Sequence, residues 1–334
     1  MKQKNYIWEI LRGLAALMVM FHHYTERYEE EIGHVDIWPL QSLYGGQFGV
    51  CMFFIFTGMF LLPSLDKADN FVSYLKKRAF RLYPYYIPCV IVSFLSLKMN
   101  IFSIGKEVSW NDFFVNLSMF QSYLGVKNVD GAYWTLSVQL TVYILMGGLF
   151  FFLQKKRKPF LFAILTWFIF DLVLSAIEMA FGYVLFSSIL IVHTIQLFVQ
   201  GILIWYISTE REYVYKQISK VALFLSPLYS FFYFSFIYVV FNFLIVAVIY
   251  LITIKKWTYD KKNVFTFLGA ISFPMYLLHQ NIGFIIIKYM ETMGYTDELF
   301  VLLPMLVIIL LSWVIMIFVE QFLIPTLCKI KKLE

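Results

Sequence analysis

The sequence predicts an all-α membrane protein, a polytopic bundle of about ten transmembrane helices with both termini in the cytoplasm. Three observations predict this fold. Of the 334 residues, 61% are hydrophobic and 14% are charged, with a mean hydropathy of +0.74, whereas a soluble domain carries about 25% charged residues and under half apolar ones. Long apolar segments recur from end to end of the chain. Basic residues gather in alternate connections between these segments.

Ten apolar segments are interpreted as spans, with ends good to a few residues. They lie at residues 7–25, 47–65, 82–97, 133–153, 160–179, 183–207, 220–234, 236–254, 264–287 and 299–323. The third and the seventh are short. Residues 111–124 are apolar but too short to cross a bilayer, so we expect them at the outer interface or in a re-entrant segment. No small-residue cleavage site follows the basic start, so we expect a retained first helix rather than a signal peptide.

The basic residues indicate the orientation of the chain. Of the 27 Lys and Arg residues, 21 fall at the termini and in alternate connections, all on one side of a ten-span chain. The opposite side holds Arg27, Lys98, Lys106, Lys127 and Lys288. The positive-inside rule makes the basic side cytoplasmic. The net charge of +6 is therefore a topology signal, and we expect no nucleic-acid partner.

No linker or internal repeat divides the sequence, so we expect one membrane domain over residues 1–334 with no appended soluble domain. The three cysteines, Cys51, Cys89 and Cys328, form no CxxC pair, so neither a disulfide framework nor a metal site is expected. The lipid bilayer is the partner that the composition implies. A homo-oligomer is compatible with the sequence, which does not define an oligomeric state.

Ionisable residues inside the first span are costly in hydrocarbon and need a reason. Arg12 and His23 are 11 residues apart, close to three helical turns, so they share one face about 16 Å apart along the axis. His22 points about 100° away from that face. Snorkelling of Arg12 to the interface and a water-facing His23 are the structural alternatives.

Further polar residues are expected near the same outer level. His279 lies about 22 Å along the ninth span, a height similar to that of His23, so the two histidines could line one cavity. The alternative is that His279 joins two helices by a hydrogen bond. Tyr276 lies one turn earlier, and Ser137 and Gln139 lie one to two turns inside the fourth span.

A basic patch, YLKKRAFRLYP, lies on the predicted cytoplasmic side. Arg78 and Arg81 are one helical turn apart on one face, and guanidinium groups suit phosphates. Spacing alone favours a topology signal with anionic-lipid binding for this patch.

Five segments together resemble the acyltransferase-3 family of integral membrane acyltransferases, which O-acetylate peptidoglycan, O-antigen and nodulation factors. They are, in order, RGLAALMVMFHH, FGVCMFFIFTGMFL, RAFRLYP, WTLSVQLTVY and SFPMYLLH. The first resembles the family's Arg, ten residues, His motif, which places its roles on Arg12 and His23. Thr57 stands where the family usually has Ser, and Gln139 stands where it usually has Glu. Gln keeps hydrogen-bonding capacity but cannot act as a base.

The resemblance implies acetyl-CoA as co-substrate, a glycan hydroxyl as acceptor and the bacterial inner (cytoplasmic) membrane as location. Phosphates of CoA are then expected near Arg12, Arg78 and Arg81. His23 is the expected general base, acting directly or through a covalent acyl relay. His279, Tyr276 and Ser137 are then expected to bind the carbonyl or the acceptor, and Gln139 is a candidate site residue because it stands at the position of the family's Glu.

Two other kinds of function fit the same features. A transporter or flippase for a lipid-linked glycan would also have ten helices with a polar interior, and it would not need Arg12. Gln139 motivates an acyl-delivery protein without transferase activity of its own. The acceptor glycan and the acyl group are left open by the sequence.

Overall fold

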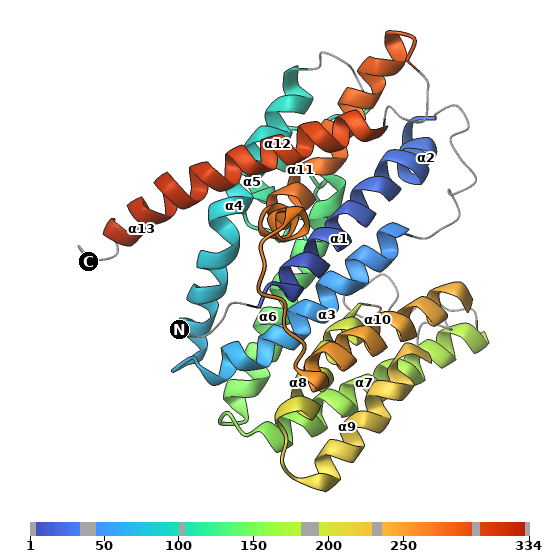
Figure 1. Ribbon diagram of the computed structural model, residues 1–334, viewed down its shortest axis with the longest axis vertical. Coiled ribbons are helices and arrows are strands. Elements are labelled where there is room, and N and C mark those ends of the chain that lie inside the picture. Colours follow the sequence, from blue (N-terminus) through green and yellow to red (C-terminus); the bar gives the residue numbers. More distant parts are fainter. Residues whose placement is uncertain are drawn as a thin grey trace. The chain divides into compact units, whose positions relative to one another are not determined.

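The computed structural model describes residues 5–33, 45–99, 104–181, 194–228, 236–295 and 301–330. Throughout these ranges the regular structure is helical, without a strand (Figure 1). Seven of the described helices are long and apolar enough to cross a membrane. The predicted all-helical membrane fold is therefore confirmed, and the protein is a multi-pass membrane protein. The number of ten spans and the cytoplasmic location of the termini stay predictions.

The chain forms two compact units that alternate along the sequence. Unit 1 contains Met1–Gly49, Ala79–Ser137 and Tyr259–Glu334, and unit 2 contains Val50–Arg78 and Val138–Thr258. Three helices pass from one unit into the other. They are α3 (Gly45–Asp66), α4 (Phe71–Met99) and α6 (Trp134–Phe152).

Unit 1 begins with one continuous helical segment and ends with another. The first contains α1 (Ile7–His22), the π-helical turn η1 (His23–Arg27) and α2 (Tyr28–Ile32). The last contains α12 (Leu302–Phe318), η6 (Val319–Leu323) and α13 (Ile324–Ile330). Between them lie α5 (Trp110–Asn116), η3 (Gly131–Tyr133) and the 29-residue α11 (Val264–Thr292).

Among the described residues, unit 2 contains four complete α-helices: α7 (Arg157–Phe181), α8 (Ile195–Thr209), α9 (Tyr213–Leu225) and α10 (Phe236–Lys255). Its core includes the rings of Phe54 and Phe198, whose centroids are 4.7 Å apart and whose planes are tilted by 31°. Small residues let α3 and α8 approach closely, because a Cβ on Gly201 would lie 2.5 Å from the backbone nitrogen of Met59.

The predicted third span, 82–97, is too short. Helix α4 runs from Phe71 to Met99 and includes the basic patch that we expected to precede the span. The local reason is a capping box, in which Asn70 Oδ1 accepts the Ser73 N–H over 2.8 Å and Ser73 Oγ accepts the Asn70 N–H over 3.2 Å. Hydropathy alone misses this start because the first turns of α4 are polar.

The predicted seventh span, 220–234, is described only in part. Its first residues belong to α9, which begins at Tyr213 and ends at Leu225, and residues 229–234 of the predicted span lie outside the described residues. Oε1 of Glu210 accepts the N–H groups of Arg211 and Glu212, which turns the chain just before α9. Part of the sixth predicted span, residues 183–193, also lies outside the described residues.

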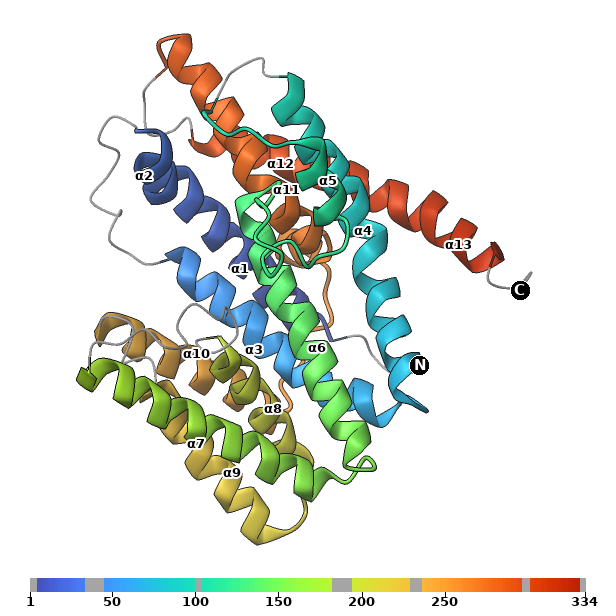
Figure 2. The same ribbon diagram turned by 180° about the vertical axis from the view of Figure 1, so that it is seen from behind.

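The apolar segment 111–124 forms the short helix α5 and a series of turns. Ser109 and Asp112 form a capping box at the start of α5. Figure 2 shows α5 near the end of α4, and the ring of Phe94 lies 4.8 Å from that of Trp110 and 4.7 Å from that of Phe113. Aromatic stacking therefore holds α5 against α4 within unit 1.

Candidate active site

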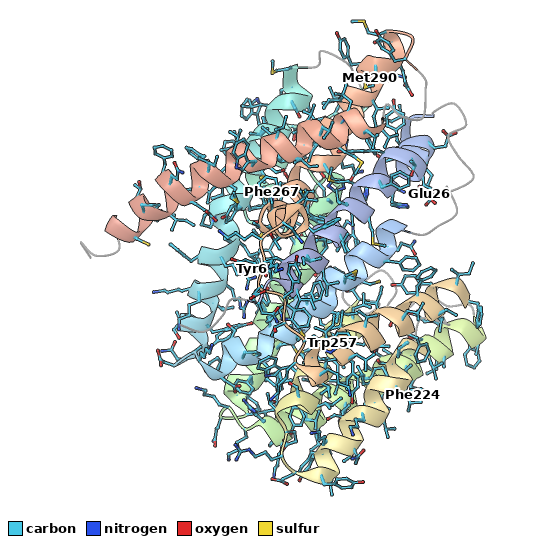
Figure 3. The ribbon with its side chains drawn as sticks, viewed as in Figure 1. Tyr6, Glu26, Phe224, Trp257, Phe267 and Met290 are labelled. Carbon is cyan, nitrogen blue, oxygen red and sulfur yellow. The ribbon has the colours of Figure 1, made fainter. Side chains whose placement is uncertain are left out.

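Helices α1 and α11 lie side by side in unit 1 and run in the same direction (Figures 1 and 2). A Cβ on Gly13 would lie 2.8 Å from the backbone nitrogen of Gly269, so the two backbones touch where both residues are glycine. Figure 3 labels Tyr6 just before α1 and Glu26 in η1, and Phe267 and Met290 towards the two ends of α11. This parallel packing brings residues of equal depth together.

His23 and His279 meet at this helix pair. Their ring centroids are 4.6 Å apart, and the rings are almost perpendicular at 89°. His279 is fully buried, and its Nε2 atom has no hydrogen-bond partner among the described residues. Two residues that are 256 positions apart in the sequence thus form one imidazole pair.

The hydrogen bonds of the two rings define their neutral tautomers. Nδ1 of His23 lies 2.9 Å from the carbonyl oxygen of Val19, and Nδ1 of His279 lies 2.8 Å from that of Tyr276. A carbonyl oxygen can only accept, so each Nδ1 must carry the proton and donate it. Each neutral ring therefore keeps its basic lone pair on Nε2, and this lone pair is what proton abstraction needs.

His22 has a different environment from that of His23. Its Nδ1 lies 2.8 Å from Oε2 of Glu26, and its ring packs where Gly46 has no side chain. Burial raises the pKa of the Glu26 carboxyl, and the charge of Glu30 adds to this effect. His22 is thus engaged with a neighbour on its own helix, as expected for a residue that points away from the Arg12–His23 face.

The π-helical turn η1 starts at His23 and was not predicted. Such turns insert an extra residue into an α-helix and occur frequently at functional sites. The turn runs to Arg27 and changes the angular position of every residue that follows His23. No sequence pattern that we used distinguishes a π-helical turn from an α-helical one.

Several residues that sequence reasoning missed hold His279 in place. The buried Tyr24 donates its hydroxyl to the carbonyl oxygen of His279 over 2.9 Å. Tyr24 fits because position 283 is a glycine, where a side chain would overlap the tyrosine ring. The sequence shows that Tyr24 follows His23, but it does not show that Tyr24 bonds to His279 on α11.

Asp130 is a buried carboxylate of unit 1 that contacts α11 close to His279. Its Oδ1 accepts the N–H of Ala132 over 3.0 Å, and its Oδ2 accepts the N–H of Asn281 over 3.1 Å. Asn281 also donates from Nδ2 to the carbonyl oxygen of Val129 over 2.5 Å. Asp130 thus ties the chain before α6 to α11, two residues after His279. Asp-Gly at positions 130 and 131 indicated only a turn.

Tyr276 lies one turn before His279 and contacts the same region. Its hydroxyl lies 3.0 Å from Oγ1 of Thr135, which itself donates to the carbonyl oxygen of Ala132 over 2.8 Å. The proton of Thr135 is used in that second bond, so Tyr276 donates to Thr135. Ser137 is fully buried two residues further along α6. The structure thus brings Tyr276 and His279 into one region of unit 1.

Arg12 lies at the other end of α1 from His23 and is close to Arg81. The positive charge of Arg81 acts on Arg12, and Oε1 of Glu9 lies 3.9 Å from the Arg12 Nη2 atom. Nε of Arg12 is buried and has no hydrogen-bond partner in the described part of the chain. Two neighbouring guanidinium groups with one weakly placed carboxylate suit a phosphate anion.

Arg78 and Gln139 belong to unit 2, and each has partners there. The guanidinium of Arg78 is buried against the rings of Tyr74 and Tyr143, at 5.4 and 4.8 Å from their centroids, and donates to the carbonyl oxygen of Phe60. Arg81, one turn later on α4, is exposed. Two arginines one turn apart on one helix therefore have different environments: Arg78 forms cation–π contacts, and Arg81 is exposed to solvent.

No group of three or more His, Cys, Asp or Glu side chains within the described ranges is placed to hold a metal ion. The histidine pair consists of two nitrogen donors at most. Its arrangement suits acid–base chemistry at Nε2.

Comparison with known proteins agrees with this kind of site. The family described as "Acyltransferase domain" (Acyl_transf_3) matches residues 5–319. Over 191 residues the chain is 26% identical to an "O-acetyl transferase" of Shigella phage Sf6, covering 52% of this chain and 54% of the relative. Over 144 residues it is 28% identical to a protein of Acidianus two-tailed virus named "Putative acetyltransferase ORF330", covering 42% of this chain and 40% of the relative.

These two matches span about half or less of each relative's own length. No solved structure matches the chain. The family match, in contrast, extends over nearly the whole sequence and includes every helix from α1 to α12. The protein therefore belongs to the acyltransferase-3 family of membrane acyltransferases and is an acyltransferase.

Proposed function

We propose that this enzyme transfers an acetyl group from cytoplasmic acetyl-CoA to a hydroxyl of a cell-surface or lipid-linked glycan, with His23 as general base. The single observation that carries the proposal is the His23–His279 pair, in which two imidazole rings, each with its lone pair on Nε2, lie 4.6 Å apart between α1 and α11. The name of the phage relative, an O-acetyl transferase, supports a hydroxyl acceptor.

The donor end of the reaction uses Arg12 and Arg81. Phosphates of CoA bind these two guanidinium groups, and the pantetheine arm extends along the α1 face towards His23. Arg12 and His23 are 11 residues apart, so the arm must extend about 16 Å. Arg78, in unit 2, stacks its guanidinium on the rings of two tyrosines, and its role in CoA binding stays a prediction from the sequence.

In the transfer step, Nε2 of His23 takes the proton of the acceptor hydroxyl while the oxygen attacks the thioester carbonyl carbon. The C–S bond of the tetrahedral intermediate then breaks, and the His23 imidazolium returns the proton to the departing CoA sulfur. His279 orients His23 or the acceptor, and Tyr276 and Ser137 support the carbonyl-binding side. In the alternative relay, His23 itself carries the acetyl group between the two substrates.

The proposed orientation in the membrane puts the donor and the acceptor on opposite sides. We place the enzyme in the bacterial inner (cytoplasmic) membrane, with both termini and the Arg12 end inside, because basic residues gather on that side. His23 and His279 then lie in the outer half, where a glycan on the far side of the membrane can reach them. The whole of residues 1–334 acts as one acyltransferase domain.

The test is transfer of radiolabelled acetyl from acetyl-CoA in membranes that contain the wild type or His23→Ala. We expect label in a glycan fraction with the wild type and none with His23→Ala, although both proteins insert into the membrane. Wild-type protein that neither binds CoA nor transfers label, in membranes that contain the acceptor, would refute the proposal and favour the transporter.

A further inference from the structure

Unit 1 has an open pocket that neither His23 nor His279 lines, with a volume of about 540 Å³. This volume is in the range of small-molecule sites. The polar lining comes from the end of α4, the segment before α5, and the chain after it. These residues are Lys98, Lys106, Glu107, Ser109, Asp112 and Lys127.

Three lysines in one pocket are unusual on this side of the protein. The predicted outer side holds five basic residues, and three of them line the pocket. The positive-inside rule describes a depletion of Lys and Arg on the outer side. A cluster that opposes this bias has a reason other than topology.

The two remaining outer basic residues have carboxylate partners of their own. Arg27 forms ion pairs with Glu30 and Glu31 at 2.8 and 2.7 Å, and Nζ of Lys288 lies 3.4 Å from Oε2 of Glu291. By contrast, none of the three pocket lysines forms an ion pair within the described part of the chain. The pocket is thus the place on this side where positive charge is left uncompensated at short range.

The carboxylates of the pocket do not neutralise the lysines directly. Oδ2 of Asp112 accepts the N–H and the hydroxyl of Ser109 over 2.7 and 2.8 Å, which caps α5. The charge and the backbone of Lys127 also act on Asp112, without an ion pair between the two side chains in the described part of the chain. With three ammonium groups and two carboxylates, the pocket keeps a net positive charge that an anion can use.

Lys106 connects the pocket to the histidine pair. Its Nζ donates to Oδ1 of Asn281 over 3.1 Å, and Asn281 lies two residues after His279 on α11. Asn281 and His279 are therefore about 3 Å apart along the axis of α11. Burial lowers the pKa of the Lys106 ammonium, and the charges of Asp130 and Glu31 oppose this effect. A partly buried cation next to the site attracts an anion more strongly than an exposed one does.

We propose that the pocket lined by Lys98, Lys106 and Lys127 binds an anionic group of the acceptor, a phosphate or a carboxylate attached to a sugar. This inference rests on the proposed function and names the class of its acceptor. The anion sits at the lysines, and the sugar extends from them past Asn281 towards His279. Acceptor charge then determines which glycans the enzyme modifies.

The test measures binding, without acetyl-CoA, to the purified full chain in a bilayer of zwitterionic lipid. The probes are glucose 1-phosphate, glucuronate and glucose. We expect saturable binding of at least one anionic sugar, at least about tenfold tighter than binding of glucose and weakened by salt. Tighter binding of glucose 1-phosphate assigns a phosphate, and tighter binding of glucuronate assigns an acidic sugar.

Lys106→Gln should weaken the binding of the anionic sugar by about tenfold or more, because a charge-assisted hydrogen bond is lost. Lys288→Gln is the matched control, since it removes an outer cation that does not line the pocket. Lys106 is partly buried, so a second variant, Lys98→Gln with Lys127→Gln, changes only exposed side chains and should also weaken binding.

Equal affinity for glucose and the anionic sugars, or anion binding that neither lysine variant changes, would overturn the proposal. Glycerol 3-phosphate that binds as tightly as glucose 1-phosphate would assign the pocket to a lipid headgroup and overturn it as well. Binding needs no catalysis, so a wild type that binds anionic sugars but never transfers acetyl would contradict the proposed function alone.

Discussion

Gln139 donates a hydrogen bond from Nε2 to Oγ1 of Thr57 over 3.1 Å. It donates a second one to the hydroxyl of Tyr143 over 2.8 Å. Positions 57 and 139 are the two at which the sequence departs from the family pattern, and in unit 2 they are partners. A glutamate at 139 would accept from both hydroxyls, whereas the glutamine donates to them. The change of residue therefore reverses the hydrogen bonds without removing them.

Gln139→Glu should fold normally and transfer acetyl at least as fast as the wild type. The new carboxylate can accept from Thr57 and Tyr143, and the ring of Tyr143 lies under the cationic Arg78. Thermal unfolding and radiolabel transfer check this expectation. Activity in Gln139→Glu together with an inactive wild type would instead identify the natural chain as an acyl-delivery protein without its own transferase activity.

Thr57→Val is the companion variant for this pair. It removes one acceptor of Gln139 while keeping the shape of the side chain, and we expect a loss of about 1 kcal/mol in stability. The midpoint of thermal unfolding in detergent measures this loss. An unchanged midpoint in Thr57→Val would show that the Gln139–Thr57 bond contributes nothing to the fold.

His23→Ala should lower the transfer rate by about 10²–10⁴-fold, the usual contribution of a general base. His22→Ala should have a milder effect, because His22 is engaged with Glu26 and not with His279. Single-turnover transfer with both variants at equal membrane levels makes the comparison. Equal losses in the two variants would contradict the assignment of the base to His23.

Arg12→Lys should weaken CoA binding by about tenfold, although the positive charge is kept. The reason is that a lysine cannot offer the planar fork that binds a phosphate with two parallel hydrogen bonds. Titration of CoA into the purified protein measures the affinity. Wild-type affinity in Arg12→Lys would remove Arg12 from the donor site.

Tyr276→Phe should slow acetyl transfer several-fold, because the hydroxyl that holds the His279 turn against Thr135 is lost. The cost in stability should be about 1 kcal/mol. Rate and unfolding midpoint are measured on the same preparation. A variant that loses stability but keeps the wild-type rate would show that Tyr276 has no role at the site.

Gly269→Ala should destabilise unit 1 by about 1–3 kcal/mol, because the new methyl group would overlap the backbone of Glu9 on α1. Backbone cannot move aside as a flexible side chain can. Gly148→Ala is the matched control, since nothing lies within 4 Å of a Cβ at that position. Equal unfolding midpoints for the two variants would contradict the close approach of α1 and α11.

Several properties of this protein could be predicted from local sequence alone. Apolar length and charge bias predict membrane helices and an orientation, because each helix must satisfy its own backbone in lipid. The 3.6-residue period places Arg12 and His23 on one face, and counting residues places His23 and His279 at one depth. These arguments need only one helix at a time.

Other properties depend on which helices are neighbours. The sequence contains Tyr24, Asp130 and Lys106 as ordinary polar residues, and only packing makes them partners of His279 and Asn281 on α11. Likewise, the spacing of Arg78 and Arg81 puts both on one face of α4, but in the structure Arg78 is buried and Arg81 is exposed. Periodicity and depth are local quantities that the sequence determines, whereas lateral contacts join residues more than 250 positions apart, such as His23 and His279, and only the tertiary structure decides them.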